Sequence, residues 1–353
     1  MNPTRLLVRL PNWVGDILMA RPAIQALRAR WPDALFVGMA RAPHAALVER
    51  LGVFELVVEA PVGTGLDRAA AVWVAARALR SLRLDTAVIF APSFEAALSV
   101  WLAGVGSRVG HATDHRRLLL THAVAPRRGV HRTDEYLELV RVLGAGDPTP
   151  AALPLALTRA DRSYAAQLFD TLAWPADCRP LFVNPAAAKT PRAWSEDRFR
   201  TLVERLRGSG CLVLVHDRFP FSAPAGWVPG RGVALVRDAT LPELAALLER
   251  CALYVGNDSG PAHLAAAVGI PAVTIHGPSS PDRTAPRATA PLPHVAVSAG
   301  FDCSPCRERF FDECPSPASV DGRPPCLIAV EVDAVAAAVQ QVLERTVTRP
   351  ASP

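Results

Sequence analysis

Residues 256–263 form a polar turn whose residue types suit the binding of a phosphate group. The turn reads Gly-Asn-Asp-Ser-Gly-Pro-Ala-His and lies between an apolar run, residues 252–255, and a helix-like run, residues 264–268. A strand that leads directly into a helix leaves the first N–H groups of the helix free, and the positive end of the helix dipole then faces a bound anion. Pro261 suits a first helical turn, where its missing N–H costs nothing. The same residues also suit an ordinary helix cap, so both interpretations stand.

The neighbouring segments place this turn at the edge of a parallel sheet. Residues 240–243 form a capping box that opens a helix over residues 241–250, and residues 271–275 read as the next strand. A second polar loop, residues 276–281, follows that strand. The order helix, strand, loop, helix, strand, loop puts both loops at the carboxyl edge of one sheet, where α/β proteins bind nucleotides.

A second turn, near the N-terminus, carries a carboxylate in a similar setting. Residues 6–10 read as a strand, residues 11–16 end in Gly-Asp, and a helix with an apolar stripe at steps of three and four follows. Together with the Asn-Asp-Ser-Gly-Pro-Ala-His turn and the Gly-Pro-Ser loop at 277–279, this turn resembles a glycosyltransferase family. That family includes the ADP-heptose:lipopolysaccharide heptosyltransferases, and the resemblance covers nearly the whole chain.

The resemblance implies an α/β fold of the GT-B type, with two Rossmann-like domains, each with a parallel sheet, facing each other across a cleft. Strands that alternate with helices in the first half of the chain predict a parallel sheet with covered faces. A proline-rich segment near residue 150 predicts the linker. We therefore expect an acceptor-side domain at 1–150 and a nucleotide-sugar-binding domain at 151–329. A last helix within 330–347 is expected to pack back on the first domain.

Glycosyl transfer needs a base for the acceptor hydroxyl, and Asp16 is the candidate. The resemblance implies this role, because the aspartate of the family's Gly-Asp turn is its proposed base. The alternative is that Asp16 only caps a helix that begins at Ile17. The chain has no Asp-x-Asp motif placed for a metal-bound sugar nucleotide and neither of the glycine-rich dinucleotide and P-loop patterns. An inverting reaction without metal or cofactor is therefore expected.

A loop at residues 184–194 supplies the cations that a departing diphosphate needs. It resembles the family's Pro-Gly-Ala…Lys-Arg-Trp loop, with Arg192 at the position of the family's lysine. Solvated loop charges are the alternative for both cations of the loop. The donor-binding residues that the resemblance implies are Asn184, Lys189, Arg192, Asp258, Ser259, Gly260 and His263. Asp258 is expected to accept hydrogen bonds from sugar hydroxyls, and a buried core histidine is the alternative for His263.

A basic segment is the candidate for contact with an anionic acceptor, and a solvated basic face is the alternative. Its members are Arg108, His111, His115, Arg116 and Arg117. Four cysteines near the C-terminus, Cys303, Cys306, Cys314 and Cys326, have the spacing C-x2-C-x7-C-x11-C. The first pair has the spacing of zinc ligands, so a structural zinc site and a metal-free thiol-rich loop both remain open.

Composition narrows the class of partner. The 353 residues carry 38 basic and 33 acidic side chains, a net charge of +5, and only 6% are aromatic. No basic run is interleaved with stacking aromatics, so nucleic-acid binding is not expected. No apolar run approaches the about 20 residues of a membrane span, and the N-terminus has no signal-peptide pattern. We expect a cytoplasmic protein, with weak peripheral association at the inner face of the cytoplasmic membrane as a further expectation, since the family's acceptor is lipid-linked.

The predicted function is transfer of heptose from ADP-heptose to an inner-core acceptor of lipopolysaccharide. Transfer from another nucleotide sugar, or to another acceptor, is the alternative within the same fold. A non-catalytic scaffold that binds a nucleotide sugar, and a nucleotide-sugar epimerase, are alternatives from other classes. The presence of both Asp16 and the Asp258 turn favours an enzyme over a scaffold.

Overall fold

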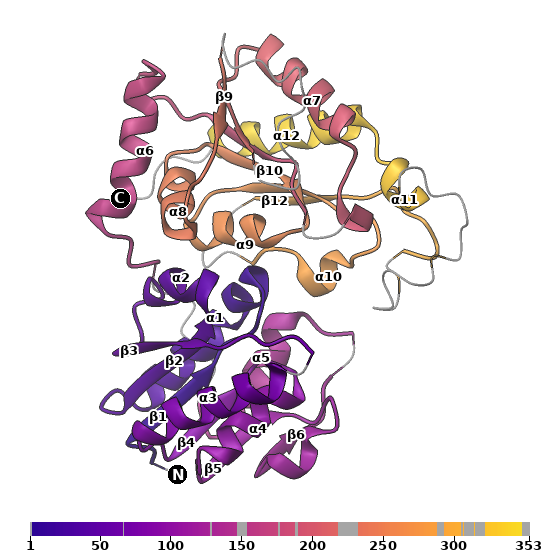
Figure 1. Cartoon of the computed structure of the whole chain (residues 1–353). Helices are drawn as coiled ribbons and strands as arrows, with labels where there is room; N and C mark the ends of the chain where they lie inside the picture. The colour runs from indigo at the N-terminus through magenta and orange to yellow at the C-terminus, as the bar shows by residue number, and fades with distance from the viewer. Residues whose placement is uncertain are drawn as a thin grey trace. The chain divides into compact units, whose positions relative to one another are not determined.

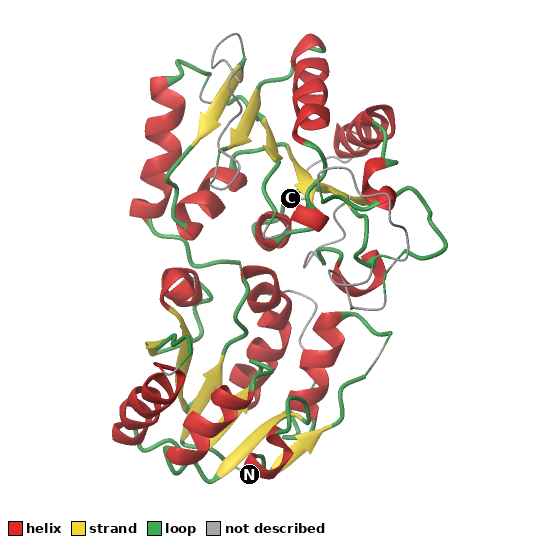
Figure 2. Cartoon of the chain, turned by 45° about the vertical axis from the view of Figure 1, so that its right-hand side comes forward, coloured by secondary structure: helices red, strands yellow, loops and turns green. Residues whose placement is uncertain are grey.

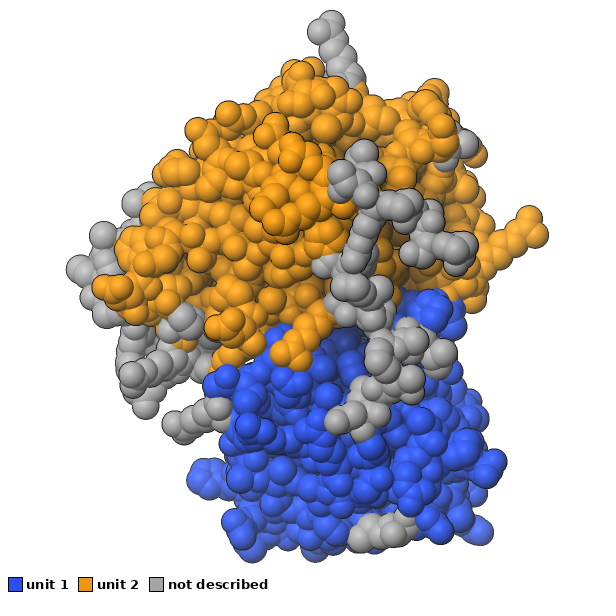
Figure 3. All heavy atoms as spheres, turned by 180° about the vertical axis from the view of Figure 1, so that it is seen from behind, with its two compact units in different colours: residues 1–156 blue, residues 157–353 orange. Residues whose placement is uncertain are grey.

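The chain forms two compact units, Met1–Ala156 and Leu157–Pro353 (Figure 3). The computed structural model describes residues 2–65, 67–127, 129–146, 154–175, 177–187, 190–217, 232–287, 293–304, 306, 314 and 322–347. The division after Ala156 lies a few residues beyond the predicted boundary at residue 150. Among the described helices, none is long and apolar enough to cross a membrane.

The first unit contains a six-stranded parallel sheet in the order β3-β2-β1-β4-β5-β6 (Figure 1). The strands are β1 (Arg5–Arg9), β2 (Leu35–Arg41), β3 (Leu56–Ala60), β4 (Thr86–Ile89), β5 (Ser107–His111) and β6 (His122–Val124). The helices are α1 (Val14–Arg30), α2 (Ala45–Glu49), α3 (Asp67–Ser81), α4 (Phe94–Leu102) and α5 (Arg132–Arg141), with short 3₁₀ helices η1 (Ala42–His44) and η2 (Arg116–Leu119). This confirms the predicted parallel α/β sheet.

Helices cover both faces of this sheet because successive strand residues point to opposite sides. Helices α3 and α4 pack together over the face that contains Leu7, Val37 and Ile89. Helices α1 and α5 pack against each other, and the ring of Tyr136 in α5 meets Phe90 edge-on at 5.2 Å. Figure 2 shows the helices on either side of the strands. The contact between α1 and α5 brings Tyr136 of α5 close to Asp16, the third residue of α1.

The second unit repeats this strand order. Its six-stranded parallel sheet, β9-β8-β7-β10-β11-β12, has the same sequence of neighbours as the first sheet. The strands are β7 (Leu181–Asn184), β8 (Val213–His216), β9 (Val233–Val236), β10 (Leu253–Asn257), β11 (Ala272–Ile275) and β12 (His294–Val297). The helices are α6 (Arg159–Thr171), α7 (Glu196–Gly208), α8 (Leu241–Glu249), α9 (Gly260–Ala267), α10 (Pro281–Thr284), α11 (Pro325–Ile328) and α12 (Val332–Val347), with η3 (Thr190–Arg192).

The strand order locates where each unit can bind a ligand. In both units the first strand lies beside the fourth, β1 beside β4 and β7 beside β10, and the chain leaves this pair in opposite directions. Ligands of such sheets bind outside the carboxyl ends of the strands at this switch point. The turns that carry Asp16 and Asp258 follow β1 and β10, so each lies at the switch point of its own unit.

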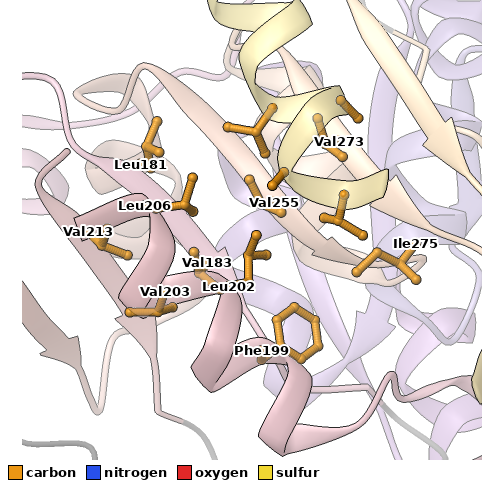
Figure 4. Packing of buried hydrophobic residues seen from close by; sticks show 14 of the residues in the cluster. Leu181, Val183, Phe199, Leu202, Val203, Leu206, Val213, Val255, Val273 and Ile275 are labelled. Carbon is orange, nitrogen blue, oxygen red and sulfur yellow. The ribbon is translucent and has the colours of Figure 1, made fainter. Parts of the chain in front are cut away.

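The core of the second unit lies between its sheet and two of its helices, α7 and α12. Aliphatic residues of β7, β10 and β11 pack against Phe199, Leu202 and Val203 of α7 (Figure 4). Helix α12 joins the same core through Val335 and Val339, and it contacts α7, β10, β11 and β12. The apolar stripe of this helix is thus buried against its own unit's sheet. The expectation that the last helix also packs back on the first domain stays a prediction.

The edges of the sheets and the start of α1 also differ from expectation. Strands β6 and β12 were not predicted, because they are short and only partly buried and so lack a continuous apolar run. Helix α1 begins at Val14 rather than at Ile17, so Asp16 is its third residue and Trp13 is the residue that precedes it.

Candidate active site

Asp258 follows β10 at the switch point of the second unit. Its side chain is only 4% exposed and forms an ion pair with Arg192, whose Nη2 lies 2.5 Å from Oδ2. The hydroxyl of Thr284 donates a bond of 3.1 Å to the same oxygen. Burial alone raises the pKa of a carboxyl group, but electrostatic interactions with His276, Arg192 and His263 and a hydrogen bond from Ser279 outweigh it here, and the pKa of Asp258 lies below its ordinary value. The carboxylate is therefore ionised at neutral pH and held in one orientation.

Asn257, the last residue of β10, fastens the loop that carries Arg192. Its Oδ1 accepts a bond of 2.8 Å from the backbone N–H of Trp194, and its Nδ2 donates a bond of 2.8 Å to the carbonyl of Pro185. Asn257 is fully buried. These two bonds tie both ends of the loop between β7 and α7 to the neighbouring strand. The position of Arg192 is thus set from outside the loop.

Asn184, a predicted donor contact, is fully buried at the end of β7. Its Nδ2 lies within 3.0–3.2 Å of three acceptors: the carbonyl of Ala186, the hydroxyl of Tyr254 and the hydroxyl of Ser259. Its Oδ1 lies 2.9 Å from Nδ1 of His216. Because both ends of this amide are bonded inside the protein, Asn184 is better placed to hold the turn than to touch a ligand itself.

The helix after the turn begins as the sequence predicts. Ser259 precedes α9 with an extended backbone, and its side chain does not cap the helix. Its hydroxyl instead bonds to Asn184, so the first N–H groups of α9 receive no bond from the Ser259 side chain. Ser259 and Gly260 are both partly exposed. His263 lies one turn into the helix and is 6% exposed, and its charge acts on Asp258.

The loop after β11 lies close to Asp258 and contains polar residues that sequence reasoning missed. His276 is fully buried, and burial lowers its pKa despite the charge of Asp258. Its Nε2 lies 2.8 Å from the hydroxyl of Thr274, and its Nδ1 lies 3.2 Å from that of Ser279. The Thr274 hydroxyl also lies 2.8 Å from Nε2 of His294. The sequence signal that could have revealed this polar group is the threonine at 274 and the histidine at 276, two alternate positions at the end of an otherwise apolar strand.

A glycine is required at two places around this site because other atoms approach too closely for a side chain. A Cβ on Gly256 would lie 2.6 Å from the hydroxyl of Tyr254 and 2.7 Å from the carbonyl of Asn184. A Cβ on Gly277 would lie 2.9 Å from that of Leu327. The two glycines of the predicted motifs thus allow β10 and the Gly-Pro-Ser loop to pack tightly.

Asp16 occupies the corresponding edge of the first unit. The Tyr136 hydroxyl donates a bond of 3.1 Å to its Oδ1, and Nε of Arg132 lies 3.8 Å from the same oxygen. Both partners come from α5, and Arg132 also pairs with Glu135 at 2.5 Å. The Asp16 side chain remains 28% exposed. A carboxylate held by a phenol and a distant guanidinium, with part of its surface open, can accept a proton from a substrate.

The basic segment predicted for the acceptor is used mostly inside the protein. Arg116 is fully buried and donates from Nε to the carbonyl of His111 at 2.8 Å. Arg108 donates from Nε to the carbonyl of Leu119 at 2.7 Å. Burial, Arg116 and Arg132 lower the pKa of His111 to about 4. Of this segment, His115 and Arg117 are exposed.

Two further predictions concern Lys189 and the cysteines. Lys189 lies outside the described residues. The four cysteines are described as free thiols, and burial followed by the neighbouring thiols raises the pKa of Cys326 to about 11. Within the described residues, no group of three or more His, Cys, Asp or Glu side chains is placed to hold a metal ion. The structural zinc site at the four cysteines stays a prediction.

Known proteins resemble this chain in sequence and in fold. The sequence model of glycosyltransferase family 9 (heptosyltransferase) matches residues 72–313. Lipopolysaccharide heptosyltransferase 2 of Escherichia coli K12 is 27% identical over 315 residues, which cover 80% of this chain and 85% of the relative.

Solved structures agree on the fold. The structure of E. coli ADP-heptose LPS heptosyltransferase II is similar with a TM-score of 0.76 and 21% identity, covering 98% of this chain and all of the other. A family 9 glycosyltransferase from Veillonella parvula has a TM-score of 0.79 and 18% identity, covering 97% of each chain. The α/β fold with two Rossmann-like sheets is that of these GT-B-like enzymes. The family match over two thirds of the sequence, together with this fold, shows that the chain is an enzyme and belongs to glycosyltransferase family 9, the heptosyltransferase family.

Proposed function

We propose that the enzyme transfers heptose from ADP-heptose to a hydroxyl group of a lipopolysaccharide inner-core acceptor. The observation that carries the proposal is the ion pair between Arg192 and Asp258 beside the start of α9. Arg192 would provide a cation for a diphosphate, and Asp258 a fixed carboxylate for sugar hydroxyls. The start of α9 would add a helix N-terminus at the same switch point. One solved protein of this fold is described as an ADP-heptose LPS heptosyltransferase, which supports the choice of donor.

The donor residues divide into contacts and supports. Arg192 and the N–H groups that open α9 would hold the diphosphate, with Lys189 as a second cation. Asp258 would accept hydrogen bonds from the sugar, because its ionised oxygens can only accept. His263 would stand near the phosphate end. Asn184 and Asn257 would keep the loop and the turn together.

Asp16 would act as the base. The acceptor hydroxyl attacks the anomeric carbon and forms the new C–O bond while its proton passes to the Asp16 carboxylate. The bond between the anomeric carbon and the diphosphate oxygen breaks, and the nucleoside diphosphate leaves with the electron pair. One displacement from the opposite side inverts the anomeric configuration. Arg192 and the helix N-terminus take up the charge that grows on the leaving diphosphate, so the step requires no metal ion.

A thermal-shift panel of ADP-, GDP- and UDP-sugars tests the donor. A ligand that binds the folded protein raises its unfolding temperature by mass action, so ADP-heptose should give the largest shift. A larger shift with a GDP- or UDP-sugar would favour the alternative in which another nucleotide sugar is the donor. A lipid-linked acceptor would place the reaction at the cytoplasmic face of the membrane, where we expect weak peripheral association.

Metal independence has its own test. Transfer should continue at an unchanged rate after treatment with EDTA, because a guanidinium and backbone N–H groups supply the positive charge. The rate is measured before and after chelation, with magnesium or manganese added back. Loss of activity that either metal restores would overturn the metal-free mechanism.

A further inference from the structure

A row of polar side chains crosses the sheet of the second unit and leads to Asp258. It begins at His294, the first residue of the edge strand β12, and continues at Thr274 of β11. It then passes through His276 and Ser279 in the loop after β11. Because β11 lies between β12 and β10, the row runs from the edge of the sheet toward the turn after β10. We call these side chains, from His294 to Ser279, the polar row.

Each member of the polar row is in hydrogen-bonding contact with the next. The Thr274 hydroxyl lies 2.8 Å from Nε2 of His294 and 2.8 Å from Nε2 of His276. Nδ1 of His276 lies 3.2 Å from the hydroxyl of Ser279. The side chain of Ser279 forms a hydrogen bond with the carboxylate of Asp258. All of these groups except the partly exposed His294 are buried, so bulk water does not compete for the bonds.

The charge of Asp258 decides where the first proton of the row points. The pKa of this carboxyl group lies below its ordinary value, so the group is ionised and can only accept hydrogen bonds. The single hydroxyl proton of Ser279 must therefore point toward the carboxylate. The Ser279 oxygen is then an acceptor for Nδ1 of His276, and this nitrogen must carry a hydrogen atom. His276 is thus held as its Nδ1–H tautomer.

The rest of the row follows because both histidines are neutral at neutral pH. Burial is the largest cause that lowers the pKa of His276, and it lowers the pKa of His294 to about 4. A neutral imidazole has one N–H group and one acceptor nitrogen, so Nε2 of His276 must accept the hydroxyl proton of Thr274. The Thr274 oxygen then accepts from His294, whose Nε2 carries the hydrogen. Every bond is therefore donated in the direction of Asp258.

The reverse direction would break the contact with the carboxylate. If Nε2 of His276 carried the hydrogen and donated to Thr274, its Nδ1 would have to accept the proton of Ser279. The Ser279 oxygen would then face an ionised carboxylate with no hydrogen between the two acceptors. A buried acceptor that loses its donor costs free energy, and more so when it is charged. One direction of the row is therefore favoured, and it is the direction that serves Asp258.

We propose that the members of the polar row are positioning residues, which orient the Asp258 carboxylate for the hydroxyl groups of the donor sugar. Ser279 donates to this carboxylate at the end of the row, while Arg192 and Thr284 donate to its Oδ2. These donors fix the plane of the carboxylate, and the acceptor positions that they leave open are those available to a sugar. The sugar as ligand rests on the proposed function, whereas the direction of the row rests on contacts and charges alone.

The tautomers of the two histidines test the direction of the row. Proton–nitrogen correlation NMR of the whole, ligand-free chain with isotope-labelled histidine reports which ring nitrogen carries the hydrogen. The spectra are recorded at neutral pH, and His276→Gln and His294→Gln assign the signals. We expect the Nδ1–H tautomer at His276 and the Nε2–H tautomer at His294. The Nε2–H tautomer at His276, or a doubly protonated ring there, would overturn the proposal.

Calorimetric titration with ADP-heptose and with ADP tests the effect on binding. Thr274→Val replaces the hydroxyl by a methyl group and interrupts the row. It should weaken ADP-heptose about 2- to 10-fold, as expected for the loss of one hydrogen bond, and leave ADP unchanged, since ADP lacks the sugar. Thr274→Ser keeps a hydroxyl and should restore the affinity. The matched control is Thr86→Val, at a buried strand threonine of the first unit whose side chain is also hydrogen-bonded.

Ser279→Ala interrupts the row outside the strands, so the test does not depend on one substitution in the core. It should reproduce the selective loss of ADP-heptose. Equal losses of ADP-heptose and ADP in both variants, or no loss in either, would rule out the positioning role.

The remaining outcomes separate this proposal from the proposed function. If the thermal-shift panel selects another sugar nucleotide, that compound and its nucleoside diphosphate replace ADP-heptose and ADP in the titrations. If the tautomers and the selective loss hold but no heptose is transferred, the polar row stands and the proposed reaction fails. If heptose is transferred while Thr274→Val and Ser279→Ala bind the donor as the wild type does, the reaction stands and the polar row fails.

Discussion

The two units have the same strand order but place their key carboxylates on opposite sides of the switch point. In the first unit Asp16 follows the first strand, β1, whereas in the second unit Asp258 follows the fourth, β10. The loop after the first strand also differs, with residues 10–13 in one unit and residues 185–195 in the other. The longer loop brings Arg192 to the neighbouring strand's turn. The same architecture thus places a carboxylate either directly after the first strand or beside a cation that the loop after the first strand supplies.

The surroundings of the two carboxylates differ as much as their positions. Asp258 is 4% exposed with a guanidinium at 2.5 Å, whereas Asp16 is 28% exposed with a guanidinium at 3.8 Å and a phenol at 3.1 Å. A buried, paired carboxylate stays ionised and binds, while a partly open one can exchange a proton. The comparison therefore supports the proposed division, with donor binding in the second unit and proton transfer in the first.

The largest effect is expected from the carboxylate of the first unit. Asp16→Asn keeps the size of the side chain and removes the base, so kcat should fall by about two to four orders of magnitude. Affinity for the donor should be unchanged, because the donor residues lie in the other unit. Steady-state kinetics and donor titration check both parts. Near-normal turnover would show that Asp16 serves only the helix terminus.

Asp258→Asn should separate the sugar from the nucleotide. Replacing one acceptor oxygen by an NH2 donor and removing the charge should weaken binding of the sugar nucleotide by about 1–3 kcal/mol, since a sugar hydroxyl loses a charged acceptor. The free nucleoside diphosphate should bind as well as before or more tightly, because Arg192 no longer shares its charge with a carboxylate. Calorimetric titration with both ligands measures this. Equal losses for the two ligands would remove Asp258 from the sugar site.

Tyr136→Phe tests how far the partners of Asp16 matter. It removes one hydrogen bond of 3.1 Å to the carboxylate while the ring keeps its edge contact with Phe90. A loss of about 0.5–1.5 kcal/mol predicts a fall in kcat of roughly two- to tenfold. The KM for the donor serves as the internal control. An effect as large as that of Asp16→Asn would show that the base is Asp16 acting together with Tyr136 rather than Asp16 alone.

The smallest effect is expected on stability in acid, where the two units are compared through one histidine of lowered pKa in each. Burial, as the first cause in each case, lowers the pKa of His111 in the first unit and of His294 in the second to about 4. Because each histidine binds a proton more readily in the unfolded chain, folding stability should fall as the pH drops from about 6.5 toward 4. Denaturant unfolding of His111→Gln and His294→Gln should show a weaker pH dependence than the wild type.

The exposed His115 provides the control for this pair. His115→Gln should leave the pH dependence of unfolding as it is in the wild type. If only one of the two buried-histidine variants becomes less sensitive to acid, acid lability belongs to that unit alone. An unchanged pH dependence in both would contradict the prediction.

The local signals in the sequence were enough to locate both turns and most of the sheet. Strands such as 181–183 and 233–236 are continuous apolar runs, and the capping box at Thr240 marks the start of α8. The turns around Asp16 and Asp258 are read from neighbours in sequence, since a strand, a polar turn and a helix are all local patterns. The resemblance to the glycosyltransferase family then suggested what the side chains in these turns do.

Contacts between distant residues had to come from the tertiary structure. Tyr136 lies 120 positions from Asp16, and Arg192 lies 66 positions from Asp258, so no local period links them.

The last helix shows the same division between sequence and structure. The amphipathic pattern of residues 330–343 predicted a helix with one apolar stripe, and the structure confirms the helix as α12. The pattern contains no information on which sheet receives the stripe, and packing placed Val335 and Val339 in the second core. Periodicity determines which face of an element is buried, because it depends only on the backbone's own geometry. The partner of that face depends on the path of the whole chain.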